Sequence, residues 1–142
     1  MNGYYTTEID EAIQAGRSAI YALDRAESAL SGARSFGLWD MFGGGFISGM
    51  LKHSKMDEAQ RELENAQREL ARFKKELADV QMTGQINIRF DGLVKFVDLF
   101  CDNVLVDMMV QSRIKDMMNH LRETRRQVQD TINRLERYKL GG

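Results

Sequence analysis

The sequence contains no proline, so the strongest helix-breaking residue is absent from all 142 residues. A single cysteine, Cys101, excludes an internal disulfide. Twenty lysine and arginine residues face twenty-one aspartate and glutamate residues, and the formal net charge is −1. Such a balance gives no global field that would attract nucleic acid or an anionic membrane. These absences favour a protein of long helices and argue against a disulfide scaffold or a polyanion-binding protein.

Long hydrophobic runs are also missing, although a helix needs about 20 apolar residues to cross a bilayer. The longest stretch of low charge, LWDMFGGGFISGML at residues 38–51, is shorter and is broken by glycine. The first residues, MNGYYTTEIDEA, have neither the basic start nor the apolar core of a signal peptide. We therefore expect no transmembrane span and a cytoplasmic location.

The residues that are present have an ordinary globular balance, 43% hydrophobic and 29% charged, so residues 1–142 are expected to form one domain. Apolar residues recur every three or four positions over two stretches, which predicts two helices that each bury one face. The first runs from about 7 to 35 and buries Ile9, Ala12, Gly16, Ala19, Leu23, Ala26, Leu30 and Ala33. The second runs from about 54 to 82 and buries Met56, Ala59, Leu63, Ala66, Leu70, Phe73, Leu77 and Val80.

The rest of the chain predicts a connector at 83–90, a short apolar helix at about 91–101 and a long helix at about 103–139. The long helix repeats the same spacing at Ile114, Met117, Leu121, Thr124, Val128, Thr131, Leu135 and Tyr138. The predicted fold is all-α: an elongated, antiparallel, coiled-coil-like three-helix bundle with a short extra apolar helix and a Gly-rich crossover at 36–53.

The Gly-rich crossover has three possible explanations. It is a packed elbow if its apolar side chains and those of residues 90–110 cover each other at one end of the bundle, with glycine allowing the chain to turn. That cluster would contain Trp39, Phe42, Phe46, Ile47, Met50, Phe90, Val94, Phe96, Val97, Phe100 and Leu105. A phosphate loop is disfavoured because Met50 and Leu51 stand where lysine and a hydroxyl residue are needed. A membrane-surface wedge followed by Lys52 stays open as the third explanation.

Other candidate chemistry is sparse. His53 and His120 match no zinc-binding spacing, and Cys101 has no basic neighbour in sequence to activate its thiol. A cation-binding group is conceivable at Asp91, Asp98, Asp102 and Asp107, but the apolar neighbours favour a solvated helix face. Residues 113–139 hold eight basic residues against four acidic ones, which the acidic interruptions make a poor nucleic-acid site. We predict no catalytic residue, no metal site, no cofactor, no small-molecule substrate and no nucleic-acid partner.

The segments WDMFGGG, LKHSKMDEA and FCDNVLVDMMVQSRI resemble those of a group of uncharacterised bacterial helical proteins. The resemblance spans Trp39 to Ile114 and implies no activity. It implies that part of the crossover acts as one unit. That unit consists of Trp39, Asp40, Gly43, Gly44, Gly45, Lys52 and His53. These seven residues and Phe42 are the candidate structural or interaction motif.

The function expected from these patterns is that of a non-enzymatic helical scaffold or protein-interaction module. It is expected to form a homo-oligomer or bind a protein partner, because a narrow bundle would leave apolar flanks uncovered. Those flanks hold Met108, Met109, Met117, Met118 and Ile132. The alternative is a peripheral membrane protein that inserts residues 38–51.

Overall fold

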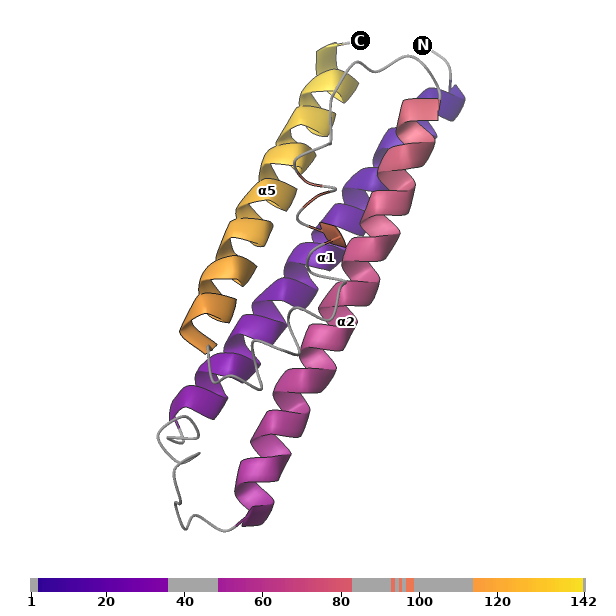
Figure 1. Ribbon diagram of the computed structural model, residues 1–142. Coiled ribbons are helices and arrows are strands. Elements are labelled where there is room, and N and C mark those ends of the chain that lie inside the picture. Colours follow the sequence, from indigo (N-terminus) through magenta and orange to yellow (C-terminus); the bar gives the residue numbers. More distant parts are fainter. Residues whose placement is uncertain are drawn as a thin grey trace.

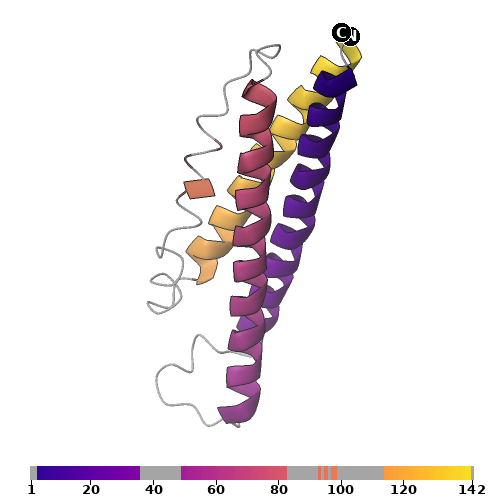
Figure 2. The same cartoon turned by 90° about the vertical axis from the view of Figure 1, so that its right-hand side faces the viewer.

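Three long helices make up almost all of the described chain. The computed structural model describes residues 3–35, 49–82, 93, 95, 97, 98 and 114–141, all with helical backbone. α1 spans Gly3–Ser35, α2 spans Gly49–Met82 and α5 spans Ile114–Gly141. The helices lie side by side, as Figures 1 and 2 show. The predicted all-α class and helical bundle are therefore confirmed.

α1 is the helix that the other two share. It packs against both α2 and α5, whereas no Cα atoms of α2 and α5 lie within 8 Å of each other among the described residues. The sequence of α1 suits this central place because α1 buries apolar side chains on both sides of the predicted seam. Ile13 is buried and lines a hollow with Glu136 and Lys139 of α5, and a second row of small side chains, Ala15, Ala22 and Ala29, is buried on the other side. A helix with two apolar rows has a neighbour on each side.

Salt bridges show how the helices are aligned. Arg25 of α1 pairs with Glu62 of α2, and near the other end of the pair Glu8 lies beside Glu76. Residue numbers therefore rise in opposite directions along α1 and α2, which the colours of Figure 1 also show. α5 pairs with α1 in the same reversed order, from Lys139 with Asp10 to Arg122 with Glu27.

The buried faces of α1 and α2 follow the predicted spacing. In α1 the buried seam consists of Ile9, Ala12, Gly16, Ala19, Leu23, Ala26 and Leu30. In α2 it consists of Ala59, Leu63, Ala66, Leu70, Phe73, Leu77 and Val80. The side chains of Ala33 and Met56 lie outside the described residues. α2 begins at Gly49, earlier than the predicted start near Ser54, so residues 49–53 of the predicted crossover are helical.

Side chains of α2 and α5 both reach α1 at Gly16. A Cβ atom on this residue would lie 2.8 Å from Ile132 Cγ1 of α5 and 3.0 Å from Phe73 Cε1 of α2. Both neighbours are buried, so neither can swing into solvent. Glycine at this position is what allows α5 and the largest side chain of the α2 core to approach α1 together.

α5 completes the core of the bundle without help from a second copy of the chain. Its buried seam includes Thr124 and Thr131, whose hydroxyls donate hydrogen bonds of 2.8 Å to the carbonyl oxygens of His120 and Gln127. The expectation that its apolar flank needs a second chain is wrong at three positions, because Met117, Met118 and Ile132 are buried within this one. Packing against α1 and the shared core covers them. Met108 and Met109 lie outside the described residues.

The described part of the predicted short helix lies against α2. Leu93 and Val97 are helical and buried in the common core, and Asp98 Oδ1 lies 2.5 Å from Lys74 Nζ. Lys74 is about 37 Å along α2 from Gly49 at 1.5 Å per residue. Val97 and Asp98 therefore lie far along α2 from its first residue. The predicted contact of Val97 with the crossover stays a prediction, because Trp39, Phe42, Phe46 and Ile47 lie outside the described residues. Phe90, Val94, Phe96, Phe100 and Leu105 lie outside the described residues.

None of the described helices combines the length and the apolar character needed to cross a membrane.

Candidate functional site

The motif predicted from the crossover falls largely outside the described residues. This applies to Trp39, Asp40, Phe42, Gly43, Gly44 and Gly45. Lys52 and His53 belong to the first part of α2, and their side chains are not among those described. A packed elbow built on Trp39 and a membrane wedge at residues 38–51 both stay predictions.

Four basic residues of α5, Arg122, Arg125, Arg126 and Lys139, pair with carboxylates. Arg122 and Arg125 pair with Glu27 and Asp24 of α1 at 2.7 and 2.8 Å. Together with Arg17 to Glu136 and Lys139 to Asp10, they form a row of ion pairs along the α1–α5 contact. Arg126 binds Glu123, and this hydrogen bond lowers the pKa of the Glu123 carboxyl. Three of these basic residues, Arg122, Arg125 and Lys139, therefore match α5 to the acidic side chains of α1.

A groove between α1 and α2 is the most distinctive feature of the described surface. Two open hollows of about 390 and 400 Å³ meet at Tyr21. Residues of α1 form the floor of this α1–α2 groove: Ser18, Ala22, Ser28, Ala29 and Gly32. Side chains of α2 form the opposite wall, at Glu58, Glu62, Asn65, Glu69 and Arg72.

The groove is hollow because the α1 residues on its floor are small. Ala22 and Ala29 belong to the second buried row of α1 and place only a methyl group against α2. Beyond them, a Cβ atom on Gly32 would meet nothing within 4 Å. A larger side chain at these positions would fill the space that the groove now leaves open.

Tyr21 stands at the middle of the groove with 64% of its surface exposed. The guanidinium carbon of Arg25 lies 5.7 Å from the centre of its ring, within the range of a cation–π contact. Arg25 is itself held by two hydrogen bonds, of 3.0 and 3.1 Å, to the carboxylate of Glu62. The hydrogen bond with the Glu62 carboxylate raises the pKa of the Arg25 guanidinium, and a smaller contribution in the same direction comes from the hydrogen bond with Tyr21. The aromatic ring and the guanidinium are thus presented to solvent as one ordered pair.

Three glutamates follow one another along α2 at seven-residue intervals, Glu62, Glu69 and Glu76, and the first two line the groove. Of these three, Glu62 is the one whose two carboxylate oxygens both accept hydrogen bonds from the described residues, in each case from the guanidinium of Arg25. Oε2 of Glu69 and Oε2 of Glu76 are buried and accept no hydrogen bond from the described residues. The Glu69 oxygen lies 3.8 Å from Arg72, too far for a hydrogen bond. Buried carboxylate oxygens without hydrogen-bond donors cost stability, and at Glu69 the charge of Arg72 offsets part of that cost.

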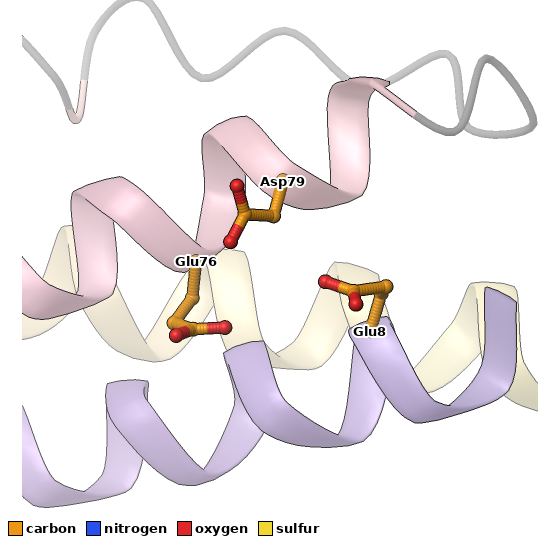
Figure 3. A group of neighbouring side chains, drawn as sticks. All are labelled: Glu8, Glu76 and Asp79. Atoms are coloured by element: carbon orange, nitrogen blue, oxygen red, sulfur yellow. The ribbon is translucent and has the colours of Figure 1, made fainter. Parts of the chain in front are cut away.

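Three carboxylates gather where the row ends. Glu8 of α1 and Glu76 and Asp79 of α2 place one oxygen each within 4.8 Å of one another, and Figure 3 shows these side chains gathered between the two helices. Carboxylate oxygens are the ligands that calcium and magnesium prefer. This group was not expected from the sequence, in which Asp91, Asp98, Asp102 and Asp107 were the candidate cation ligands. Of these, Asp98 pairs with Lys74, and the others lie outside the described residues.

A spacing in the sequence could have revealed the groove. Ala15, Ala22 and Ala29 recur every seven residues beside the predicted seam, and so do Glu62, Glu69 and Glu76. Two such rows on paired helices face each other only if the helices are aligned as they are here.

Comparisons with models of known protein families, with curated proteins and with solved structures found no match. The geometry of the α1–α2 groove is therefore the feature that bears on function.

Proposed function

We propose that this protein is a non-enzymatic helical scaffold, an interaction module whose α1–α2 groove receives a partner protein. The exposed pair of Tyr21 and Arg25 at the centre of the groove carries the proposal. Tyrosine and arginine are among the residues most enriched at binding hot spots, and Tyr21 has the central position typical of them.

The shape of the groove also favours a protein over a small molecule. Small-molecule sites are usually concave, largely apolar and able to enclose most of their ligand. The two hollows beside Tyr21 are open to solvent, and charged side chains form their α2 wall. An extended surface of this kind suits another helix or a peptide segment.

The packing of α1 and α2 would hold such a surface rigid. We propose that they form an antiparallel coiled coil, supported by the reversed order of the ion pairs and by the regular burial of their seams. Pre-ordering of the binding surface lowers the entropic cost of association.

Self-association stays a separate proposal. The burial of Met117, Met118 and Ile132 within one chain removes part of its original motivation. A partner in the groove is either a different protein or a second copy, and sedimentation velocity of the purified protein distinguishes them. A single species at the 16.3 kDa of one chain is expected if the partner is a different protein.

Occupancy of the groove is tested by cysteine labelling in a Cys101→Ser background. Ser28→Cys lines the groove, while Gln60→Cys lies on the exposed face of α2 and is the matched control. We expect a maleimide to label position 28 at least about threefold more slowly in cells than in the purified protein, and position 60 at similar rates in both. Equal labelling of position 28 in cells and in purified form would contradict the proposal.

A further inference from the structure

We infer that Glu62 of α2 is a positioning residue for the α1–α2 groove: through Arg25 it holds the Tyr21 side chain of α1 in place for the partner. This role rests on the proposed function and adds how the centre of the groove is kept ready to bind. Three observations support it: the two-point contact between Glu62 and Arg25, the contact of Arg25 with the Tyr21 ring, and the rise in exposure from Glu62 to Tyr21.

Tyr21 lacks the packing that fixes the position of a buried side chain. With 64% of its surface exposed, it stands above a floor of serine, alanine and glycine, whose short side chains do not reach around the ring. An exposed side chain in such a place exchanges rotamers within nanoseconds unless a contact holds it. Arg25 lies four residues further along α1, where helical side chains are neighbours, and its guanidinium carbon lies 5.7 Å from the ring centre. The guanidinium supplies the contact that the floor does not.

Arg25 can hold the ring only if Arg25 is itself held. Its side chain is 53% exposed, and a long arginine side chain has many rotamers. Glu62 fixes it from the opposite helix, because Nε of Arg25 donates to Oε2 at 3.0 Å and Nη2 donates to Oε1 at 3.1 Å. Two parallel hydrogen bonds between a guanidinium and a carboxylate set the plane of the guanidinium as well as its position. A single contact would let that plane turn away from the ring.

Glu62 is the least exposed of the three residues. Exposure rises from 18% for the Glu62 side chain to 53% for that of Arg25 and 64% for Tyr21. Order therefore passes outward, from the contact between the helices to the ring at the surface. Because Glu62 belongs to α2 and Tyr21 to α1, the ring is held in place only while the two helices are aligned as they are here. A partner in the groove thus meets the paired helices as one surface.

A purely stabilising ion pair is the competing explanation for Glu62 and Arg25. Ion pairs with exposed side chains contribute little to stability, so that role alone gives a weak reason for the two-point geometry. A pair that pre-orders a binding residue lowers the entropic cost of association instead. The two explanations differ in what the loss of Glu62 changes: stability alone, or the order of Tyr21 and the affinity for the partner.

The test variant is Glu62→Gln, and the matched control is Glu27→Gln. Each replaces a glutamate that pairs with an arginine of another helix by a neutral side chain of the same length. Glu27 pairs with Arg122 of α5 and lines neither hollow of the groove. Both variants should fold, with melting temperatures within about 5 °C of the parent, because both ion pairs include exposed arginines.

NMR of the purified, ¹⁵N-labelled protein measures the order of the pair directly. We expect the order parameter of the Arg25 Nε–H bond to lie above about 0.6 in the parent and in Glu27→Gln, and to fall below that value, into the flexible range, in Glu62→Gln. The ring proton shifts of Tyr21 should change in Glu62→Gln and stay constant in the control, because the guanidinium no longer keeps its place against the ring. A role in stability alone would leave both signals unchanged.

Affinity for the partner is measured by maleimide labelling of Ser28→Cys in the Cys101→Ser background. Each variant is compared in cells with its own purified form, so a change in the reactivity of the thiol cancels. Protection depends on the ratio of partner concentration to dissociation constant, so a roughly tenfold loss of affinity reduces a threefold protection to about 1.2-fold. We expect this reduction in Glu62→Gln, and a protection of about threefold, as in the parent, in Glu27→Gln.

Three results would overturn the role of Glu62: an Arg25 order parameter that Glu62→Gln leaves unchanged, loss of order with the protection of position 28 intact, or equal loss of protection in both variants. The second result leaves the proposed function standing, because a partner still occupies the groove. Absence of protection in the parent contradicts the proposed function itself, and the role of Glu62 with it, before any variant is compared.

Discussion

The sharpest prediction for the fold compares two glycines of α1. Gly16→Ala should destabilise the protein, whereas Gly32→Ala should stabilise it. Both residues are helical, so replacing either glycine with alanine gains about 0.5–1 kcal/mol of helix stability. What differs is the surroundings, because the new methyl group would meet Ile132 and Phe73 at position 16 and nothing within 4 Å at position 32.

The magnitude at Gly16 follows from the contact distances. The added Cβ would lie 2.8 and 2.9 Å from Ile132 Cγ1 and Cδ1 and 3.0 Å from Phe73 Cε1. Overpacking a tight core costs about 1–3 kcal/mol and outweighs the helix gain in most of that range. We expect a net loss of about 1–2 kcal/mol, or roughly 3–8 °C in melting temperature, while Gly32→Ala should gain roughly 2–4 °C.

Thermal and urea unfolding followed by circular dichroism measure both variants. Ile132→Ala tests the cause, because it removes both clashing atoms of that side chain. It should cost less stability in the Gly16→Ala background than in the parent protein, which a double-mutant cycle detects. Gly16→Ala with a melting temperature at or above that of the parent would refute the close packing of α1 against α5.

Three further predictions follow from the described contacts. Phe73→Ala should cost about 3–5 kcal/mol in urea unfolding because the ring is fully buried, and a cost below about 1 kcal/mol would contradict that burial. Burial lowers the pKa of His120 despite the opposing charge of Glu123, so the unfolded chain binds more protons below its ordinary pKa of 6.5. Stability should therefore fall as the pH drops from about 7.5 to 5.5, and His120→Gln should remove that part of the decline; an unchanged pH dependence would count against it. Arg122→Gln/Arg125→Gln should lower the melting temperature by no more than about 5 °C at low salt, because both ion pairs are solvent-exposed. The decrease should be smaller at 1 M salt, which screens the two pairs. A larger loss that salt leaves unchanged would show that these pairs do more than align α5.

The long helices could be predicted from the sequence because their pattern is local. With no proline and an apolar residue at every third or fourth position, a helix and its buried face follow from the period of the backbone alone. Leu23 in α1, Phe73 in α2 and Leu121 in α5 were all expected inside and are buried. The start of α2 was placed too late because Gly49 and Ser54 are typical of a loop and a helix cap.

Contacts between helices could not be predicted because they depend on axial alignment. Gly16 looked like one more small seam residue, and only the meeting of three helices brings Ile132 and Phe73 to it. The place of Val97 in the common core, next to the Asp98 that pairs with Lys74, did not follow from the sequence, since an apolar segment can cover any apolar surface within its reach. The α1–α2 groove was missed for a similar reason: its two walls are far apart in sequence, and the acidic surface of α2 suggested a solvated face.

In-cell photo-crosslinking from the centre of the groove tests the central claim most directly. Tyr21 is replaced by p-benzoylphenylalanine, an aromatic residue of similar shape, and Glu64 on the exposed face of α2 is replaced in the control. The account predicts a discrete covalent product with another protein from position 21 and none from position 64. The absence of a product from position 21, or the same products from both positions, would contradict the claim that this groove is a protein-binding surface.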